Sequence, residues 1–314
     1  MLRLALKKLA ILVPVALAVS VLTFLLMNLL PGDPAYTILG SRATPQSVAE
    51  LTARLHLDEP VWTRYSSWLG GVLTGDLGQS YLNYQPASSL IGHALPVTLE
   101  LLVLSQVIAL ALAVPLGVYS ARHPRGWVDR IASTVSFGTL AMPPYMLGVL
   151  LVSVFSVGLK ALPATGFTPF GDDPGLNLRS MVLPSLTLAL GSLAVYVRLL
   201  RTEMISTLQQ DFVTVARAKG LPGRAVLWRH TVRPSMFSLV TAVGINLGSL
   251  IGGAFVVEYI FALPGVGALT LNSIFQRDYL VVQACVLVVA VGYVLVNLLV
   301  DLLYPIIDPR VRHV

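Results

Sequence analysis

The sequence predicts an all-α protein that crosses a lipid bilayer several times. Of its 314 residues, 55% are hydrophobic and only 11% are charged, and the mean hydropathy is +0.79. Soluble domains carry about 25% charged residues, so this chain lacks the charge to cover a water-exposed surface of its size. Long apolar runs recur along it. Backbone polar groups in lipid must be satisfied within each segment, which favours helices.

Six runs are long enough to cross a bilayer, since a spanning helix needs about 20 apolar residues. They are residues 9–30, 95–121, 131–159, 180–200, 235–260 and 281–305. The first run follows Arg3, Lys7 and Lys8, as the core of a secretory signal would. Its 22 residues exceed the roughly 7–15 of a signal core, and no small-residue cleavage site precedes Pro31. We therefore expect residues 1–30 to form a retained membrane anchor.

The distribution of Lys and Arg predicts that both termini lie in the cytoplasm. With the N-terminus inside, 15 of the 21 basic residues fall in inner segments. The short loop 122–130 is strongly basic, whereas the outer loop 161–179 contains Asp172 and Asp173. Because positive charge is retained on the inner side, the basic segment 201–234 is also expected in the cytoplasm.

Residues 31–94 have the composition of ordinary soluble sequence and are expected to form a small helical insert on the outer side. Thr44 and Pro45 suit the cap and the first position of a helix. Pro60 starts a second helix, and a Gly-rich loop follows at 73–81. The insert either caps the outer ends of the spans or provides a docking or gating surface. Residues 95–314 then form a core of five spans.

Charged pairs are missing from the middle of the predicted spans. A proton-coupled carrier usually needs an acidic or histidine relay there, so this pattern disfavours one. Neutral polar residues do occur at depth, and hydrogen bonds between helices are the favoured interpretation for them. They are Ser105, Gln106, Ser192, Asn246, Ser249 and Asn297. Of these, Ser192, Asn246 and Ser249 are candidates for a translocation path.

The fifth predicted span contains three glycines at intervals of four residues: Gly244, Gly248 and Gly252. This spacing places all three on one helix face, where another backbone can approach closely. The partner could be a helix of this chain or of another subunit.

Several classes of chemistry are excluded because the sequence lacks the motifs that they require. No zincin, nucleophile-elbow or paired-carboxylate pattern occurs in the spans, and the single cysteine, Cys285, is expected to be a buried hydrophobe. A nucleotide-binding P-loop requires Gly-Lys, and none of the four lysines follows glycine. We expect no catalytic residue, metal or cofactor in this chain. The net charge of +6 lies in short loops, which disfavours nucleic acid.

The basic segment at 211–234 reads DFVTVARAKGLPGRAVLWRHTVRP. Gly220-Leu221-Pro222-Gly223 is a strong turn signal, and a second short helix is expected at 224–233, ending before Pro234. Small residues ahead of the turn would let this elbow enter a groove on another protein, with Phe212, Val213 and Leu227 as apolar contacts. A basic loop that only fixes topology and touches anionic lipid is the alternative.

This elbow resembles the cytoplasmic coupling motif of the inner-membrane permease subunits of binding-protein-dependent ABC importers, in their dipeptide/oligopeptide branch. The usual motif is Glu-Ala-Ala, three residues, then Gly. Ala216 and Gly220 match its second alanine and its glycine, while Thr214 and Val215 replace its first two residues. Four further stretches resemble this branch in order along the chain: residues 29–34, 57–81, 258–283 and 301–312.

The resemblance implies a permease that moves di- or oligopeptides across the cytoplasmic membrane. Its partners would be a second homologous permease, two ATP-binding subunits that hold ATP and Mg²⁺, and an external substrate-binding protein. The coupling residues would be Phe212, Val213, Ala216, Arg217, Ala218, Lys219, Gly220 and Leu221. Alternatives are another cargo, such as a nickel chelate, haem or an oligosaccharide-like solute, an ion-coupled carrier or channel, and an inert assembly scaffold.

Overall fold

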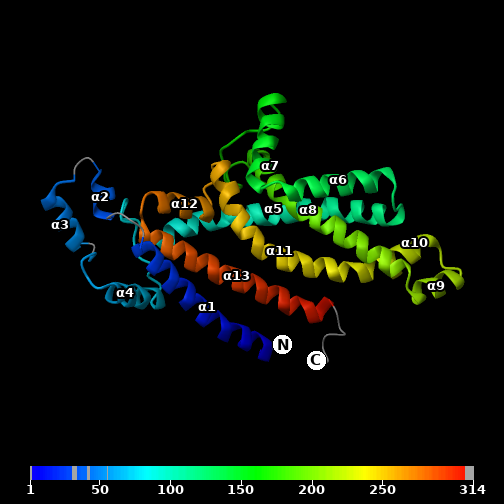
Figure 1. Ribbon diagram of the computed structural model, residues 1–314, viewed down its shortest axis with the longest axis horizontal. Coiled ribbons are helices and arrows are strands. Elements are labelled where there is room, and N and C mark those ends of the chain that lie inside the picture. Colours follow the sequence, from blue (N-terminus) through cyan, green and yellow to red (C-terminus); the bar gives the residue numbers. More distant parts are fainter. Residues whose placement is uncertain (1, 30–33, 41–42, 55, 308–314) are drawn as a thin grey trace. The chain divides into compact units, whose positions relative to one another are not determined.

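The computed structural model describes residues 2–29, 34–40, 43–54 and 56–307 (Figure 1). Helices dominate this part of the chain, and it contains no β-strand, only an isolated bridge between Gln79 and Pro86. The chain divides into two compact units. Unit 1 comprises residues 1–98 and 264–295, and unit 2 comprises residues 99–263 and 296–314.

Unit 1 contains the N-terminal helices and the short helix near the C-terminal span. Its elements are α1 (Leu2–Leu29), α2 (Pro34–Leu39), α3 (Pro45–Arg54), α4 (Val61–Leu73), the start of α5 (Ala87–Arg122), α12 (Val266–Phe275) and the start of α13 (Tyr279–Ile307). Thr44 caps α3 as predicted, because Ser47 N donates to Thr44 Oγ1 at 3.2 Å and Thr44 N donates to Ser47 Oγ at 2.9 Å. The helix after Pro60 is also confirmed.

Two apolar clusters hold unit 1 together. Phe24 of α1 packs with Tyr65 and Trp68 of α4, and the Tyr65 hydroxyl lies 2.8 Å from Ser20 Oγ. The second cluster joins α5, α12 and α13 through Ala87, Ile91, Ala94, Val266, Val281, Ala284 and Cys285. Cys285 is therefore the buried hydrophobe that the sequence predicts.

Unit 2 is arranged around one long buried helix, α8. Helix α8 spans Pro174–Leu208. The other elements of unit 2 are the rest of α5, α6 (Trp127–Ala141), α7 (Pro144–Leu151), the π-helical segment η2 (Val152–Gly158), α9 (Asp211–Ala218), α10 (Gly223–Ala225), the π-helical segment η3 (Val226–Val232), α11 (Arg233–Ile260) and the end of α13. Helices α6, α7 and α11 all pack on α8 (Figure 1). Tyr196, Leu200 and Met204 of α8 are fully buried there.

Four helices in the described residues are long and apolar enough to cross a membrane: Ala87–Arg122, Pro174–Leu208, Gly223–Ile260 and Tyr279–Val300. They correspond to four of the six predicted spans. A bent pair, Trp127–Ala141 with Pro144–Gly158, makes a fifth if counted as one span. The predicted first span is helical in α1, where Val13–Leu26 forms a shorter apolar stretch. The chain is thus helical with several spans, and the count of six stays a prediction.

The predicted span 131–159 is not one continuous helix. The chain bends by 113° between α6 and α7, and Met142 and Pro143 adopt extended backbone conformations at the break. Adjacent prolines explain this, because proline cannot donate a helical hydrogen bond and disfavours the helical conformation of the residue before it. Pro144 then occupies the first turn of α7, where proline is tolerated.

The second helix of the elbow does not end before Pro234, contrary to expectation. Residues Gly223–Ile260 form one continuous helical span. The π-helical segment η3 precedes Pro234, and hydroxyl groups bond the backbone around it: Thr231 Oγ1 donates to Val226 O at 3.1 Å, and Ser235 Oγ donates to Thr231 O at 2.9 Å. Such wide turns and hydroxyl donors are how apolar helices accommodate proline.

Parts of the sequence resemblance lie outside the described residues. These are residues 30–33, within the stretch at 29–34, and residues 308–312, within the stretch at 301–312. The short helix α12, by contrast, was not predicted. It interrupts the connection between α11 and α13, where the sequence suggested only a linking segment.

Candidate functional site

The elbow ends α9 with a tight, glycine-dependent turn. Gly220 N donates to Arg217 O at 2.9 Å, and Leu221 N donates to Ala216 O at 3.3 Å. These two bonds form a Schellman motif, which needs a left-handed residue after the helix end. Gly220 supplies it with φ of +78°. The turn predicted at Gly220-Leu221-Pro222-Gly223 is therefore present.

The buried side of the elbow packs against neighbouring helices of the same chain. Val213 and Ala216 of α9 are buried against Val226 of η3, and Leu208 at the end of α8 packs on this cluster. The small side chain at Ala216 thus serves internal packing and does not face outward. Because this cluster joins α9 to the ends of two long helices, the elbow is mechanically continuous with both.

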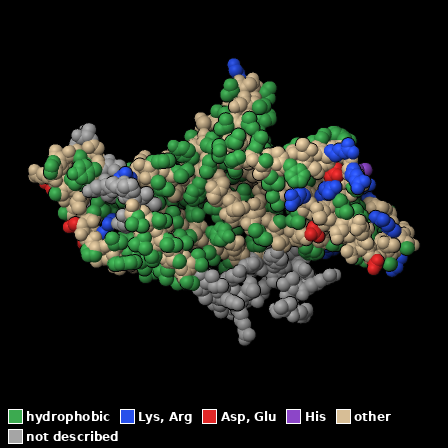
Figure 2. All heavy atoms as spheres, in the orientation of Figure 1, with side chains coloured by type: hydrophobic (Ala, Val, Ile, Leu, Met, Phe, Trp, Pro, Cys, Tyr) green, Lys and Arg blue, Asp and Glu red, His purple; other side chains and the backbone are tan. Residues whose placement is uncertain are grey.

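The solvent-exposed side of the elbow combines apolar and basic side chains. Phe212, Val215 and Leu221 are 47%, 50% and 40% exposed, and Trp228 of η3 is 52% exposed. We call these four residues the elbow surface. Arg217, Ala218, Lys219 and Gly220 are exposed beside them. Figure 2 shows Lys and Arg side chains gathered at this end of unit 2. Six of the eight predicted coupling residues therefore face outward, and Val213 and Ala216 do not.

A polar network joins α5, α8 and α11 inside unit 2. Asn246 Nδ2 donates to Ser192 Oγ at 2.7 Å and to the Tyr196 hydroxyl at 3.0 Å, and that hydroxyl donates to Gln106 Oε1 at 2.7 Å. Ser249 Oγ bonds back to Asn246 Oδ1 at 2.9 Å. The predicted hydrogen bonds between helices are thus confirmed for Gln106, Ser192 and Asn246, whereas Ser249 bonds within its own helix. Tyr196 was missed, and its only sequence signal is its position one turn after Ser192.

The three glycines of α11 do not share one contact. Gly244 is buried against α13, because a Cβ at this position would stand 2.2 Å from Val300 Cγ1. Gly248 is half-buried, whereas Gly252 is exposed and a Cβ there would meet nothing within 4 Å. The close helix contact at Gly244 is therefore made within this chain.

A partly buried ion pair joins α6 to α8. Arg201 Nε and Nη2 donate to the two carboxylate oxygens of Asp129 at 2.5 and 2.9 Å, and Arg125 N donates to Asp129 Oδ2 at 2.9 Å. This two-point geometry is the strong form of the arginine–carboxylate pair. Sequence analysis placed Asp129 in the basic loop 122–130 and Arg201 in the segment 201–234, and it did not pair them because they lie 72 positions apart.

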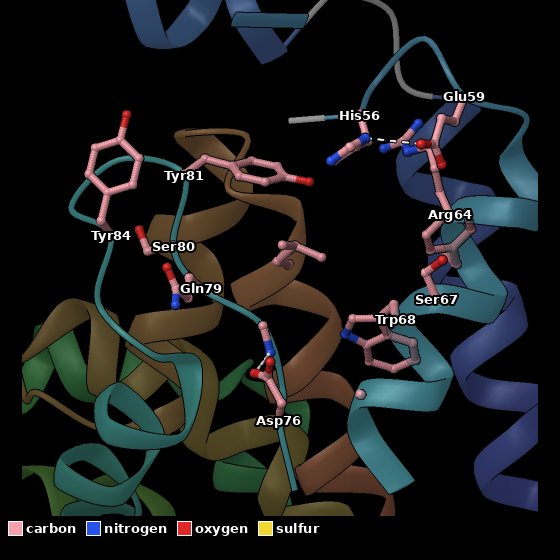
Figure 3. A pocket seen from close by; sticks show the side chains of 14 residues that line it. His56, Glu59, Arg64, Ser67, Trp68, Asp76, Gln79, Ser80, Tyr81 and Tyr84 are labelled. Carbon is pink, nitrogen blue, oxygen red and sulfur yellow. Dashed lines mark hydrogen bonds and ion pairs between the residues drawn. The ribbon is translucent and has the colours of Figure 1, made fainter. Parts of the chain in front are cut away.

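Unit 1 contains a cavity of about 480 Å³, which we call the α4 pocket (Figure 3). Helix α4 and the loop at 76–84 supply most of its walls. Phe24, Trp68 and Leu280 give it an apolar side. Arg64, Glu59 and Tyr81 are among the polar groups that line it.

A buried carboxylate holds the loop that forms one wall of this pocket. Ser80 Oγ donates to Asp278 Oδ2, and Tyr81 N donates to Asp278 Oδ1 at 3.1 Å. Asp278 is 3% exposed. Burial raises the pKa of its carboxyl above the ordinary value, although the Ser80 and Tyr81 hydrogen bonds act in the opposite direction. No sequence signal singled out Asp278.

No cluster of three or more metal-ligating His, Cys, Asp or Glu side chains occurs among the described residues.

Two family descriptions match nearly the whole chain. Residues 113–313 match the binding-protein-dependent transport system inner membrane component, and residues 1–102 match the N-terminal region of the same kind of membrane component.

Three relatives are similar over their full length. A putative peptide transport system permease protein of Brucella abortus (strain 2308) is 41% identical over 310 residues, 99% of each chain. The dipeptide transport system permease protein DppB of Alkalihalophilus pseudofirmus is 34% identical over 333 residues, and the glutathione transport system permease protein GsiC of Salmonella choleraesuis is 37% identical over 313 residues. In both cases the match covers 100% of each chain.

Proposed function

Because the chain belongs to the family of inner-membrane components of binding-protein-dependent transport systems, we propose that it is the permease subunit of an ATP-binding-cassette importer for short peptides. The similarity to full-length peptide, dipeptide and glutathione permeases carries this proposal. Glutathione is itself a tripeptide, so short peptides are the cargo class that the three relatives share. A nickel chelate or haem has no such support.

The work is divided between subunits in this proposal. A substrate-binding protein delivers the peptide, two ATP-binding subunits hold ATP and Mg²⁺, and a second homologous permease completes the path. The chain lies in the cytoplasmic membrane with both termini and the segment 201–234 inside, as the distribution of basic residues favours. Residues 31–94 then lie outside.

The elbow acts as the lever that receives motion from an ATP-binding subunit. Its exposed side offers the elbow surface for an apolar contact, with Arg217 and Lys219 beside it. Its buried side packs on α8 and η3 through Val213 and Ala216. A displacement of α9 is therefore passed to the ends of two spans, because the packed cluster leaves no room for α9 to slide independently.

The polar network is the candidate for the path through the membrane. Asn246 and Ser249 lie on α11, and Ser249 is exposed. Ser192 and Tyr196 hold the Asn246 amide in place through two accepted hydrogen bonds. In this role Asn246 and Ser249 offer polar contacts to a passing peptide backbone, while Ser192 is a positioning residue.

Uptake by cells tests the proposal. A strain that lacks the gene should fail to accumulate a radiolabelled tripeptide, and the intact gene should restore uptake. Restored uptake should stop when ATP is depleted and should survive an uncoupler when ATP is maintained. Uptake that survives ATP depletion and collapses with the uncoupler would instead support an ion-coupled carrier. Unchanged uptake in the deletion strain would contradict a transport role.

A further inference from the structure

A smaller cavity, of about 180 Å³, lies between α6 and α8 beside the Arg201–Asp129 ion pair. We call it the α6–α8 pocket. Its α6 wall runs along one face of the helix from Asp129 to Leu140, and Val197 and Arg198 line it from α8. The volume is below the roughly 300–1,000 Å³ of pockets that enclose a whole small molecule. It suits one compact group that is attached to a larger body outside the pocket.

The pocket contains one positive charge that no carboxylate balances. Asp129 is already occupied by Arg201, which donates to both of its oxygens, so that pair is neutral overall. Arg198 lies one turn before Arg201 on α8 and also lines the pocket. Its side chain is exposed and has no hydrogen-bond or ion-pair partner among the described residues. Because a guanidinium carries five N–H donors, Arg198 offers an anion both charge and free hydrogen-bonding capacity.

Two hydroxyl groups of α6 open onto the same space. Ser136 lines the pocket and is only 7% exposed, yet its hydroxyl has no hydrogen-bond partner among the described residues. The nearby Thr139 hydroxyl, by contrast, donates to the Val135 carbonyl of its own helix. Ser133 also lines the pocket without such a partner in the described part of the chain. Since buried polar groups are normally satisfied, these donors indicate a polar occupant, and arginine with hydroxyl donors suits phosphate oxygens.

The other end of the pocket is apolar. Phe137 and Leu140 line it, and both side chains are exposed. They lie further along α6 from the basic loop 122–130 than Asp129 and Ser133 do. Helix α8 is long and apolar enough to cross a membrane, and α6 belongs to the bent pair that forms a further candidate span. Exposed apolar side chains on spans face acyl chains, so the pocket changes from polar to apolar as a lipid does from its headgroup to its chains.

We propose that the α6–α8 pocket binds the phosphate of an anionic membrane lipid of the phosphatidylglycerol type, with Arg198, Ser133 and Ser136 as donors. Its acyl chains lie along Phe137 and Leu140. Basic pockets between spans on the cytoplasmic side suit acidic headgroups, and the orientation proposed above puts this end of α6 and α8 on that side. A zwitterionic lipid carries an ammonium group beside its phosphate and gains less from the unbalanced arginine. The site requires a membrane-spanning chain and does not rest on peptides as cargo.

The test is native mass spectrometry of the purified full-length chain in detergent, with phosphatidylglycerol and phosphatidylcholine of identical acyl chains supplied in equal amounts. The chain should retain phosphatidylglycerol about fivefold or more over phosphatidylcholine, as a charge-assisted hydrogen bond predicts. Excess glycerol 3-phosphate, which has the phosphate without the acyl chains, should leave the bound lipid in place. Equal retention of the two lipids would overturn the proposal. Displacement by glycerol 3-phosphate would overturn it in favour of a soluble phosphate ligand.

Variants then assign the residues. Arg198→Gln should abolish most of the preference for phosphatidylglycerol, and Ser136→Ala should reduce it by about twofold or more. Arg224→Gln removes an exposed arginine of α10 that does not line the pocket, and it should leave the preference unchanged. This control separates a site from the general attraction of a basic protein for anionic lipid.

The outcome does not depend on folding or on transport. Arg198 and Arg224 bond no other side chain among the described residues, so both variants should match wild type in thermal stability when phosphatidylcholine is the only lipid. An unchanged preference in Arg198→Gln, or equal losses in Arg198→Gln and Arg224→Gln, would contradict the proposal. Binding is measured without peptide, ATP or partner subunits, so a failed uptake assay would leave this result unaffected.

Discussion

Gly244 of α11 lies so close to Val300 of α13 that a Cβ on the glycine would stand 2.2 Å from Val300 Cγ1. Real Cβ atoms do not approach that closely, so Gly244→Ala must displace α13 or force the valine from its position. Gly252 belongs to the same four-residue repeat, yet a Cβ there meets nothing within 4 Å. The two positions form a matched pair that differs in packing alone.

Gly244→Ala should destabilise the protein by about 1–3 kcal/mol through overpacking, partly offset by the better helix propensity of alanine. Gly252→Ala should be neutral or stabilising by up to about 1 kcal/mol. Thermal unfolding of the purified protein in detergent measures both. The double variant Gly244→Ala with Val300→Ala should recover part of the loss. Equal effects of the two single variants would contradict the packing described here.

The Schellman turn predicts an asymmetry between two neighbouring glycines. Gly220→Ala places a side chain at φ of +78° in open space, so the penalty is backbone strain of about 1–2 kcal/mol. Gly223 has no positive φ and begins α10, so Gly223→Ala should cost little. Peptide-stimulated ATPase activity of the assembled transporter should fall for Gly220→Ala and persist for Gly223→Ala. Membrane insertion should persist for both, and a Gly220→Ala transporter with normal ATPase would argue against the lever.

Adjacent residues of α9 should separate folding from partner binding. Phe212 is exposed and Val213 is fully buried. Phe212→Ser should leave the thermal stability of the chain within about 0.5 kcal/mol of wild type but reduce recovery of ATP-binding subunits with the affinity-purified permease. Val213→Ser should lower the stability by about 2 kcal/mol or more, because it leaves a cavity and a buried hydroxyl. Normal recovery of ATP-binding subunits with Phe212→Ser would remove the elbow surface from the interface.

Asp278 predicts a pH dependence with a defined sign. Its folded-state pKa lies above the ordinary value of 3.8 because the carboxyl is buried. At a pH between the ordinary pKa and the folded-state pKa, the folded state retains a proton that the unfolded state has lost. The free energy of unfolding therefore falls as pH rises through this range, and the Asp278 contribution is constant above it. Asp278→Asn keeps an acceptor for Ser80 but cannot ionise.

The measurement for Asp278 is the difference in melting temperature between Asp278→Asn and wild type from pH 3.5 to pH 7. Other titrating groups largely cancel in that difference. The melting temperature of Asp278→Asn should rise relative to that of wild type as pH increases through this range, and the difference should then stay constant. A difference that does not change with pH would show that the carboxylate is not penalised by burial.

Local chemistry explains what the sequence could predict. The cap at Thr44, the helix after Pro60 and the turn at Gly220 depend on residues within four positions, and all are present. The length of an apolar run also depends only on consecutive residues, and it located most of the spans. The bend at Pro143-Pro144 also has a local cause, because adjacent prolines break a helix, whereas run length by itself predicts one span there.

Contacts between distant segments account for what was missed. The bond between Ser80 and Asp278 joins residues 198 positions apart, and the Arg201–Asp129 pair joins residues 72 apart. Neither pair has a pattern that periodicity or spacing reveals. Likewise, we predicted that Val213 and Ala216 contact a partner, whereas both are buried against η3. Only the packing of α9 shows which side of the elbow is internal.

Reconstitution tests the central claim, that this chain supplies the path and the lever while other subunits use the nucleotide. Vesicles that contain the purified chain alone should accumulate no radiolabelled tripeptide, with or without ATP. Vesicles that contain the chain with its second permease, its ATP-binding subunits and the substrate-binding protein should accumulate the peptide only when ATP is supplied to the ATP-binding side. ATP-dependent accumulation by the chain alone would contradict the account.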